Sequence, residues 1–68
     1  MDAFERRERI VDLIRSGVSK PEEIFDKLRE DVEDMNEQQF QKDLVALQFA
    51  NRIYWNAYSG YHVRGIAT

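Results

Sequence analysis

Residues 36–53 read NEQQFQKDLVALQFANRI, and this stretch carries both a start and a stop signal for a helix. Asn36 is a favoured N-cap residue, and Gln39 stands three positions later, as a capping box requires. Asn51 suits the left-handed position at which many helices end. We therefore predict a helix over about residues 37–50. Its inner face repeats at helical spacing and is built for a core: Phe40, Leu44 and Leu47.

A first helix is predicted over about residues 2–16, because Gly17 then stands where a helix-ending glycine belongs. Arg7 is expected to lay its aliphatic stem along the apolar face of this helix and to keep its charged head in water. That face is expected to bury four apolar residues: Phe4, Ile10, Val11 and Ile14. Its arginines are expected to pair with acids of the same helix: Arg6, Arg7 and Arg9 with Glu5, Glu8 and Asp12.

A second helix is predicted over about residues 20–31. Ser19 as N-cap and Glu22 three positions later form a capping box, and Pro21 lies in the first turn, where a missing N–H costs little. The buried stripe of this helix is expected to contain Ile24, Phe25 and Leu28. Two apolar residues of the acidic segment that follows are expected to cover the core: Val32 and Met35.

Beyond residue 51 the pattern changes to short, alternating runs rich in aromatic residues, which is typical of strands. We predict strands over about residues 52–56 and 61–64, joined by a turn that contains Ser59 and Gly60. The predicted fold is therefore α+β, with a single domain over residues 1–68 in which three helices precede a β-hairpin.

Charge is unevenly distributed along the chain, whose net charge is −3. Residues 19–43 hold four Lys and Arg against nine Asp and Glu, whereas residues 44–68 hold two Arg and no acid. The middle segment is expected to repel a phosphate backbone, and the last segment to tolerate one.

The composition argues against several functional classes. The chain has no cysteine, which excludes disulfides and thiolate metal sites. His62 is the only histidine, and a zinc site needs three or four ligands, so we expect no bound metal. We also expect no cofactor. His62 is expected to lie in a strand with one ring nitrogen hydrogen-bonded. No catalytic constellation or glycine-rich phosphate loop is visible, so the chain is expected not to be an enzyme. With neither a membrane-spanning apolar run nor a signal peptide, the expected location is cytoplasmic.

Four segments together resemble the winged helix-turn-helix superfamily, over about residues 4–63: RIVDLI at 9–14, PEEIFDKL at 21–28, FQKDLVAL at 40–47 and NRIY at 51–54. The resemblance implies a small winged helix whose third helix enters the major groove of double-stranded DNA while the hairpin, or wing, touches the flanking backbone. It also implies a transcriptional regulator that acts as a dimer.

The resemblance assigns the DNA contacts to particular residues. From the third helix, the residues facing DNA are Gln38, Gln41, Lys42 and Val45. Gln can read adenine, and Lys42 can contact a phosphate or a guanine. From the rest of the chain, the contacts are Lys20 near the start of the second helix and Arg52, Tyr58 and Arg64 in the wing. The chain departs from the family pattern because arginines are missing from the third helix, which instead carries Glu37 and Asp43.

Val45 and Phe49 lie one turn apart on the face of the third helix that should be solvated. Phe49 could pack as a satellite of the core, or the two residues could form an exposed patch for a protein partner or a second copy of the chain. Val45 could also touch a thymine methyl group. The patch supports an alternative function, an acidic protein-interaction module that uses Val45, Phe49 and the aromatic residues of the wing, including Tyr58.

The wing concentrates aromatic residues, namely Tyr54, Trp55, Tyr58 and Tyr61. Cross-strand packing is the expected role of most of these rings, and Tyr58, at the turn, is the ring expected to be exposed. Stacking of Tyr58 and Trp55 on single-stranded nucleic acid is a third possible function.

Overall fold

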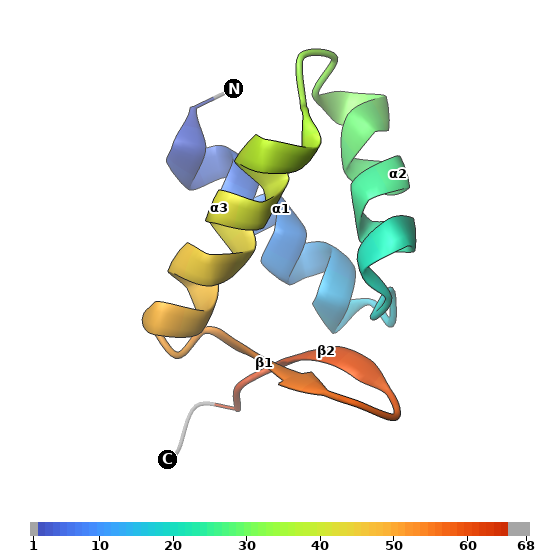
Figure 1. Cartoon of the computed structure of the whole chain (residues 1–68), viewed down its shortest axis with the longest axis vertical. Helices are drawn as coiled ribbons and strands as arrows, with labels where there is room; N and C mark the ends of the chain where they lie inside the picture. The colour runs from blue at the N-terminus through green and yellow to red at the C-terminus, as the bar shows by residue number, and fades with distance from the viewer. Residues whose placement is uncertain (1, 66–68) are drawn as a thin grey trace.

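The computed structural model describes residues 2–65, which form three helices followed by a two-stranded antiparallel hairpin (Figure 1). The elements are α1 (Ala3–Arg15), α2 (Pro21–Asp31), α3 (Glu37–Phe49), β1 (Ile53–Asn56) and β2 (Gly60–Val63). The α+β class and the order of elements are confirmed, and the observed ends lie within one residue of the predicted ones. No helix within residues 2–65 has the length and apolarity needed to cross a membrane.

The core lies between the three helices and the first strand. In Figure 1, α3 passes in front of α1, α2 stands to one side, and the hairpin closes one end of the helices. Contacts join α1 to α2, to α3 and to β2, so α1 is the central element. The rings of Phe25 and Phe40 meet at 5.1 Å between centroids. The buried apolar residues are Ile10, Val11, Ile14, Ile24, Leu28, Met35, Phe40, Leu44, Leu47 and Ile53. The predicted inner face of α3 and the predicted burial of Met35 are confirmed.

Local chemistry sets most helix ends as predicted. The side chain of Asn36 accepts a hydrogen bond from the backbone N–H of Gln39 at 2.8 Å. Asn51 has φ of 57° and Gly17 has φ of 110°, so each occupies a conformation that ends a helix. Asp2 caps α1 by accepting a hydrogen bond from the N–H of Glu5 at 2.8 Å.

The predicted capping box at Ser19 is wrong. The N-cap of α2 is Lys20, which makes no side-chain cap bond, and Pro21 is the first helical residue. The carbonyl oxygen of Ser19 accepts a hydrogen bond from the N–H of Tyr61 at 2.8 Å. Because the Ser19 backbone is held against β2 in this way, the helix begins one residue later than a Ser19 cap would allow.

Alternation along the hairpin sorts its side chains onto two faces. Ile53 is buried, and Trp55 and Tyr61 follow on its side of the hairpin, with ring centroids 4.9 Å apart. Tyr54 and His62 pair on the opposite face at 5.3 Å. Cross-strand packing of the aromatic residues is therefore confirmed.

A buried carboxylate joins α3 to α1. Asp43 is 0% exposed and accepts hydrogen bonds from the guanidinium groups of Arg6 and Arg7. Arg6 Nη2 and Arg7 Nε lie 3.0 Å and 3.1 Å from Asp43 Oδ1, and Arg6 Nε bonds to Oδ2. Burial opposes the ionisation of Asp43, but the hydrogen bonds from the two arginines outweigh it and lower the pKa of this carboxyl below its ordinary value.

The ion pairs predicted within α1 for Arg6, Arg7 and Arg9 are therefore wrong. Arg6 and Arg7 bond to Asp43 of α3, and Arg9 lies 3.4 Å from Asp31 of α2. The Arg7 guanidinium group donates to Asp43 through Nε, while the Arg7 side chain stays 37% exposed. A carboxylate removed from water needs donors, and α1 presents two guanidinium groups beside it.

The predicted burial of Phe4 is also wrong, because its side chain is 70% exposed. The side chains of Arg6 and Arg7 reach across from the first turns of α1 to α3, while the Phe4 ring stays at the surface.

Candidate functional site

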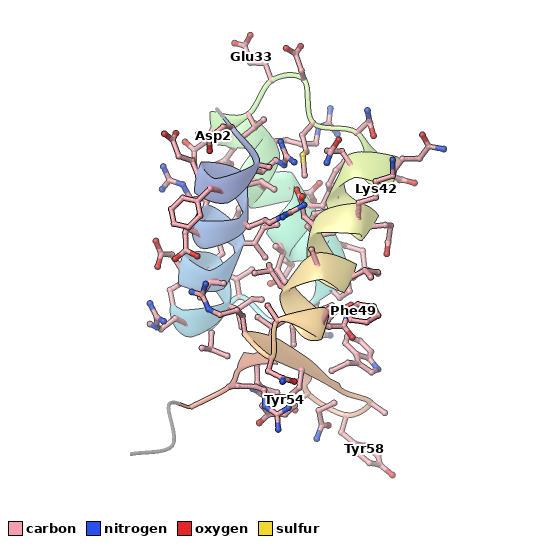
Figure 2. All side chains as sticks on the ribbon, turned by 90° about the vertical axis from the view of Figure 1, so that its left-hand side faces the viewer. Asp2, Glu33, Lys42, Phe49, Tyr54 and Tyr58 are labelled. Carbon is pink, nitrogen blue, oxygen red and sulfur yellow. The ribbon has the colours of Figure 1, made fainter. Side chains whose placement is uncertain are left out.

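The outer face of α3 consists of Gln38, Lys42, Val45 and Phe49, all of them exposed, and Gln41 lies exposed at its edge. These residues point away from the core because they lie on the opposite side of the helix from Phe40 and Leu44. In Figure 2, Lys42 and Phe49 project from the same side of α3, and Tyr58 extends from the hairpin on that side as well. The structure thus places part of the predicted helix surface and the hairpin turn on one side of the molecule.

The hairpin turn is held by its own side chains. The side-chain oxygen of Asn56 accepts hydrogen bonds from the N–H groups of Tyr58 and Ser59, at 2.8 Å and 3.1 Å. His62 Nε2 lies 2.6 Å from Ser59 Oγ, which agrees with the hydrogen bond predicted for this histidine. The Tyr58 side chain is 100% exposed, as predicted for this ring, and it stands on an ordered turn.

The four cations predicted to contact DNA differ in their surroundings. Arg52 is bound by Glu8, with nitrogen–oxygen distances of 2.7 Å and 3.2 Å. The hydrogen bonds from Arg52 lower the pKa of Glu8, so the carboxylate stays ionised and neutralises the arginine. Arg64 donates a hydrogen bond to Asn51 at 3.4 Å. Within residues 2–65, Lys20, Lys42 and Arg64 form no ion pair.

The two acids of α3 differ in exposure. Asp43 was counted from the sequence as an acid of the third helix, and the structure shows that it faces α1 and is fully buried. The two arginines that bind it compensate its charge. Glu37, in the first turn, remains exposed. The charged member of the outer face of α3 is therefore Lys42.

Phe49 is not a satellite of the core. Its side chain is 86% exposed, and that of Val45, one turn earlier, is 49% exposed. Trp55 is half exposed near the end of the hairpin ladder. The packing alternative is therefore wrong, and Val45 and Phe49 are both exposed one turn apart on α3.

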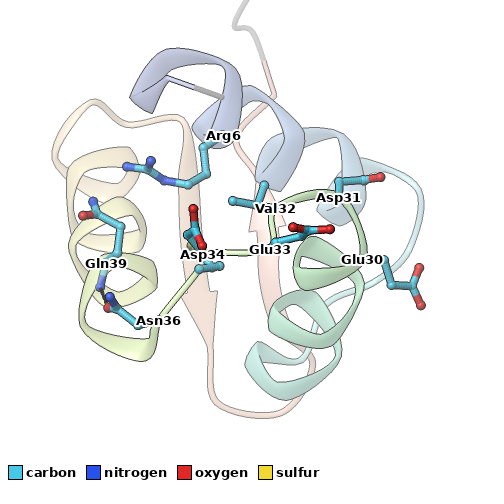
Figure 3. A pocket seen from close by; sticks show the side chains of 9 residues that line it. Arg6, Glu30, Asp31, Val32, Glu33, Asp34, Asn36 and Gln39 are labelled. Carbon is cyan, nitrogen blue, oxygen red and sulfur yellow. Dashed lines mark hydrogen bonds between the residues drawn. The ribbon is translucent and has the colours of Figure 1, made fainter.

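A hollow of about 490 Å³ lies beside the connection between α2 and α3 (Figure 3). Figure 3 shows the Arg6 side chain extending from α1 toward α3, with Gln39 of α3 opposite. The other lining residues include four acids: Glu30, Asp31, Glu33 and Asp34. Arg6 is already bonded to Asp43, and no group of three or more potential ligands within residues 2–65 could hold a metal ion.

Sequence reasoning missed the cluster of Asp43, Arg6 and Arg7. The signal was present, because Asp43 follows Phe40 by three residues and precedes Leu47 by four, which places it beside the buried face. A scan of protein-family models and searches of curated proteins and solved structures found no match to this chain.

Proposed function

We propose that the chain is a small winged-helix DNA-binding protein, a transcriptional regulator that reads the major groove with α3. The order of the three helices and the hairpin fits this fold. An α-helix with its side chains is about 10–12 Å across, close to the roughly 12 Å width of the major groove. The observation that carries the proposal is the exposed outer face of α3, which has Lys42 as its charge and lies on the same side as Tyr58.

The proposed contacts divide into base recognition and backbone positioning. Gln38 and Gln41 would hydrogen-bond to base edges, and Val45 would touch a thymine methyl group. Lys42 would bind a phosphate or a guanine. Lys20, Arg64 and Tyr58 would contact the backbone. Arg52 is left out of this set because Glu8 holds its guanidinium group.

Electrostatics sets the scale of the expected affinity. Three cations without acidic partners give a slope of about −2.7 for log affinity against log salt concentration. One copy of the chain would therefore bind weakly, and specific recognition would require two copies on adjacent half-sites.

We expect Lys42→Glu to abolish binding to a pool of random 20-base-pair duplexes, because it reverses the charge on the outer face of α3. Binding by the native chain should weaken about 40-fold between 50 and 200 mM salt, as three phosphate contacts imply. Fluorescence anisotropy measures both effects. Nuclear magnetic resonance should place the perturbed signals in residues 38–45 and 56–60.

Lys27→Glu is the matched control, since Lys27 is exposed on α2 and the DNA model assigns it no contact. It makes the same change in net charge and should retain most of the binding. Equal losses in the two variants, or binding that does not respond to salt, would refute recognition through α3.

A second candidate function, a protein-interaction module, is favoured by the 86% exposure of Phe49 beside Val45. An aromatic ring left this exposed is available to anchor a protein interface. In its simplest form, the partner is a second copy of the chain.

We expect Phe49→Ala to abolish self-association while changing the free energy of unfolding by no more than about 0.5 kcal/mol, as is usual for surface positions. Sedimentation equilibrium over a range of concentrations measures the first effect, and urea unfolding the second. Phe4→Ala is the control, because Phe4 is 70% exposed on α1. A native chain that remains monomeric at millimolar concentration would eliminate the homodimer.

A further inference from the structure

A groove of about 410 Å³ lies between α2 and the first half of α3, and both apolar and polar residues line it. Pro21, Phe25 and Phe40 line it. Phe25 and Phe40 pack at 5.1 Å between ring centroids, with an angle of 50° between the ring planes. Phe40 is buried by the core, whereas Phe25 remains half-buried, so part of its side chain is accessible beside the Arg29 guanidinium group.

The rim of the groove is acidic. Glu22 and Asp26 stand on α2 and Glu37 on α3, and all three are exposed. None of them forms an ion pair within the described part of the chain. One cation lines the groove, Arg29, and its guanidinium group lies over the Phe25 ring at 5.5 Å from the centroid.

Three acids of the acidic middle segment of the chain line this groove, and the proposed DNA contacts include none of these acids. Residues 19–43 hold nine acids against four Lys and Arg. Asp43 and Asp31 are paired with arginines of α1, but the carboxylates of the rim are not. A phosphate backbone would be repelled at the rim, so the charge there favours a cationic ligand.

We propose that the groove between α2 and α3 binds a short segment of a partner protein in which an apolar or aromatic side chain is flanked by lysine or arginine. The apolar side chain would cover the exposed part of Phe25 and displace water from it. The flanking cations would pair with Glu22, Asp26 and Glu37. Charge complementarity thus selects this occupant over a nucleic acid. The groove shares Gln41 with the edge of the outer face of α3, and its other lining residues lie apart from that face.

The test is selection of a random 12-residue peptide library on the folded chain. Selected peptides should share an apolar or aromatic residue next to Lys or Arg. The variant Glu22→Gln/Asp26→Asn/Glu37→Gln should bind them at least tenfold more weakly, because it removes the three rim charges with little change in shape. Resonances of Phe25 and Gln41 should shift when a selected peptide is added to the native chain.

The matched control is Glu23→Gln/Glu30→Gln/Glu33→Gln, which removes three exposed acids that do not line the groove. It should bind the selected peptides within about twofold of the native chain, as should Phe49→Ala. Circular dichroism establishes that each variant is folded. The proposal fails if no peptide is enriched, if the enriched peptides lack Lys and Arg, or if both triple variants lose affinity equally. Self-association that depends on the rim carboxylates would instead identify a second copy as the occupant and overturn the assignment to a partner protein.

Discussion

Asp43→Asn is expected to lower the free energy of unfolding by about 2–4 kcal/mol. Removing one partner of a buried ion pair costs roughly 3–5 kcal/mol, because it leaves the other charge uncompensated. The side chain of Arg6 is only 12% exposed, so it would lose its partner where little water can replace it. We place the expected loss about 1 kcal/mol below that range because the Arg7 side chain, at 37% exposure, can turn back to solvent.

Urea unfolding at pH 7, followed by circular dichroism, measures this loss. Asp12→Asn is the control, because Asp12 pairs with Arg15 on the surface, where the two side chains are 67% and 62% exposed. An exposed pair of this kind contributes at most about 1 kcal/mol. Similar losses in the two variants would show that the contact between Asp43 and α1 does not stabilise the fold.

The same cluster is expected to make stability depend on pH. Burial of Asp43 raises its pKa. The hydrogen bonds from Arg6 and Arg7 lower this pKa and outweigh the effect of burial, so the net shift is downward. A lowered pKa in the folded state contributes stability above the unfolded pKa of about 3.9, and this contribution is lost as pH falls through the folded pKa. The native chain should therefore lose stability below about pH 4, and Asp43→Asn should show a shallower acid dependence in thermal unfolding.

Gly60→Ala is expected to destabilise the fold by about 3 kcal/mol, through backbone strain and a steric clash. Gly60 has φ of +89°, and a Cβ atom there would lie 2.4 Å from the carbonyl oxygen of Ser19. That oxygen accepts the hydrogen bond from Tyr61 N–H, so relief of the clash would push β2 away from the segment before α2. The clashing atom belongs to the backbone of Ser19, which cannot rotate aside as a flexible side chain can.

Gly17→Ala separates the strain from the clash. Gly17 also has positive φ, at +110°, but an added Cβ would meet nothing within 4 Å. This variant should lose about 1 kcal/mol, from backbone strain alone. In amide hydrogen exchange, Gly60→Ala should remove the protection of the Tyr61 N–H, and Gly17→Ala should retain it. Equal losses of stability in the two variants would contradict the close approach of β2 to Ser19.

The sequence predicted the elements well because their signals are local. The caps at Asn36 and Asn51 act within one turn of backbone, and the inner face of α3 follows from its 3.6-residue repeat. Ser19 was the exception among the caps. Serine is a favoured N-cap residue, but the backbone carbonyl of Ser19 accepts a hydrogen bond from Tyr61 N–H, 42 positions later in the chain.

The candidate site was predicted in part. Exposure of Gln38, Lys42 and Tyr58 followed from helical spacing and from the position of the turn. Which of the predicted cations pair with acids of the same chain did not follow from the sequence, because ion pairing depends on contacts between distant parts of the fold. Arg52 pairs with Glu8, 44 residues away in sequence, so the structure links a cation that the resemblance assigned to DNA to an acid of α1.

The sequence by itself determined the ends of the helices and strands to within one residue, which face of α3 is buried, and that the middle of the chain is acidic. Only the tertiary structure decided that Asp43 is a buried partner of Arg6 and Arg7, that Phe49 is exposed, and that three carboxylates line one groove with Phe25 and Phe40. The reason is physical. Caps and periodicity act over a few residues of backbone, whereas burial and ion pairing depend on which distant side chains the folded chain brings within a few ångströms of one another.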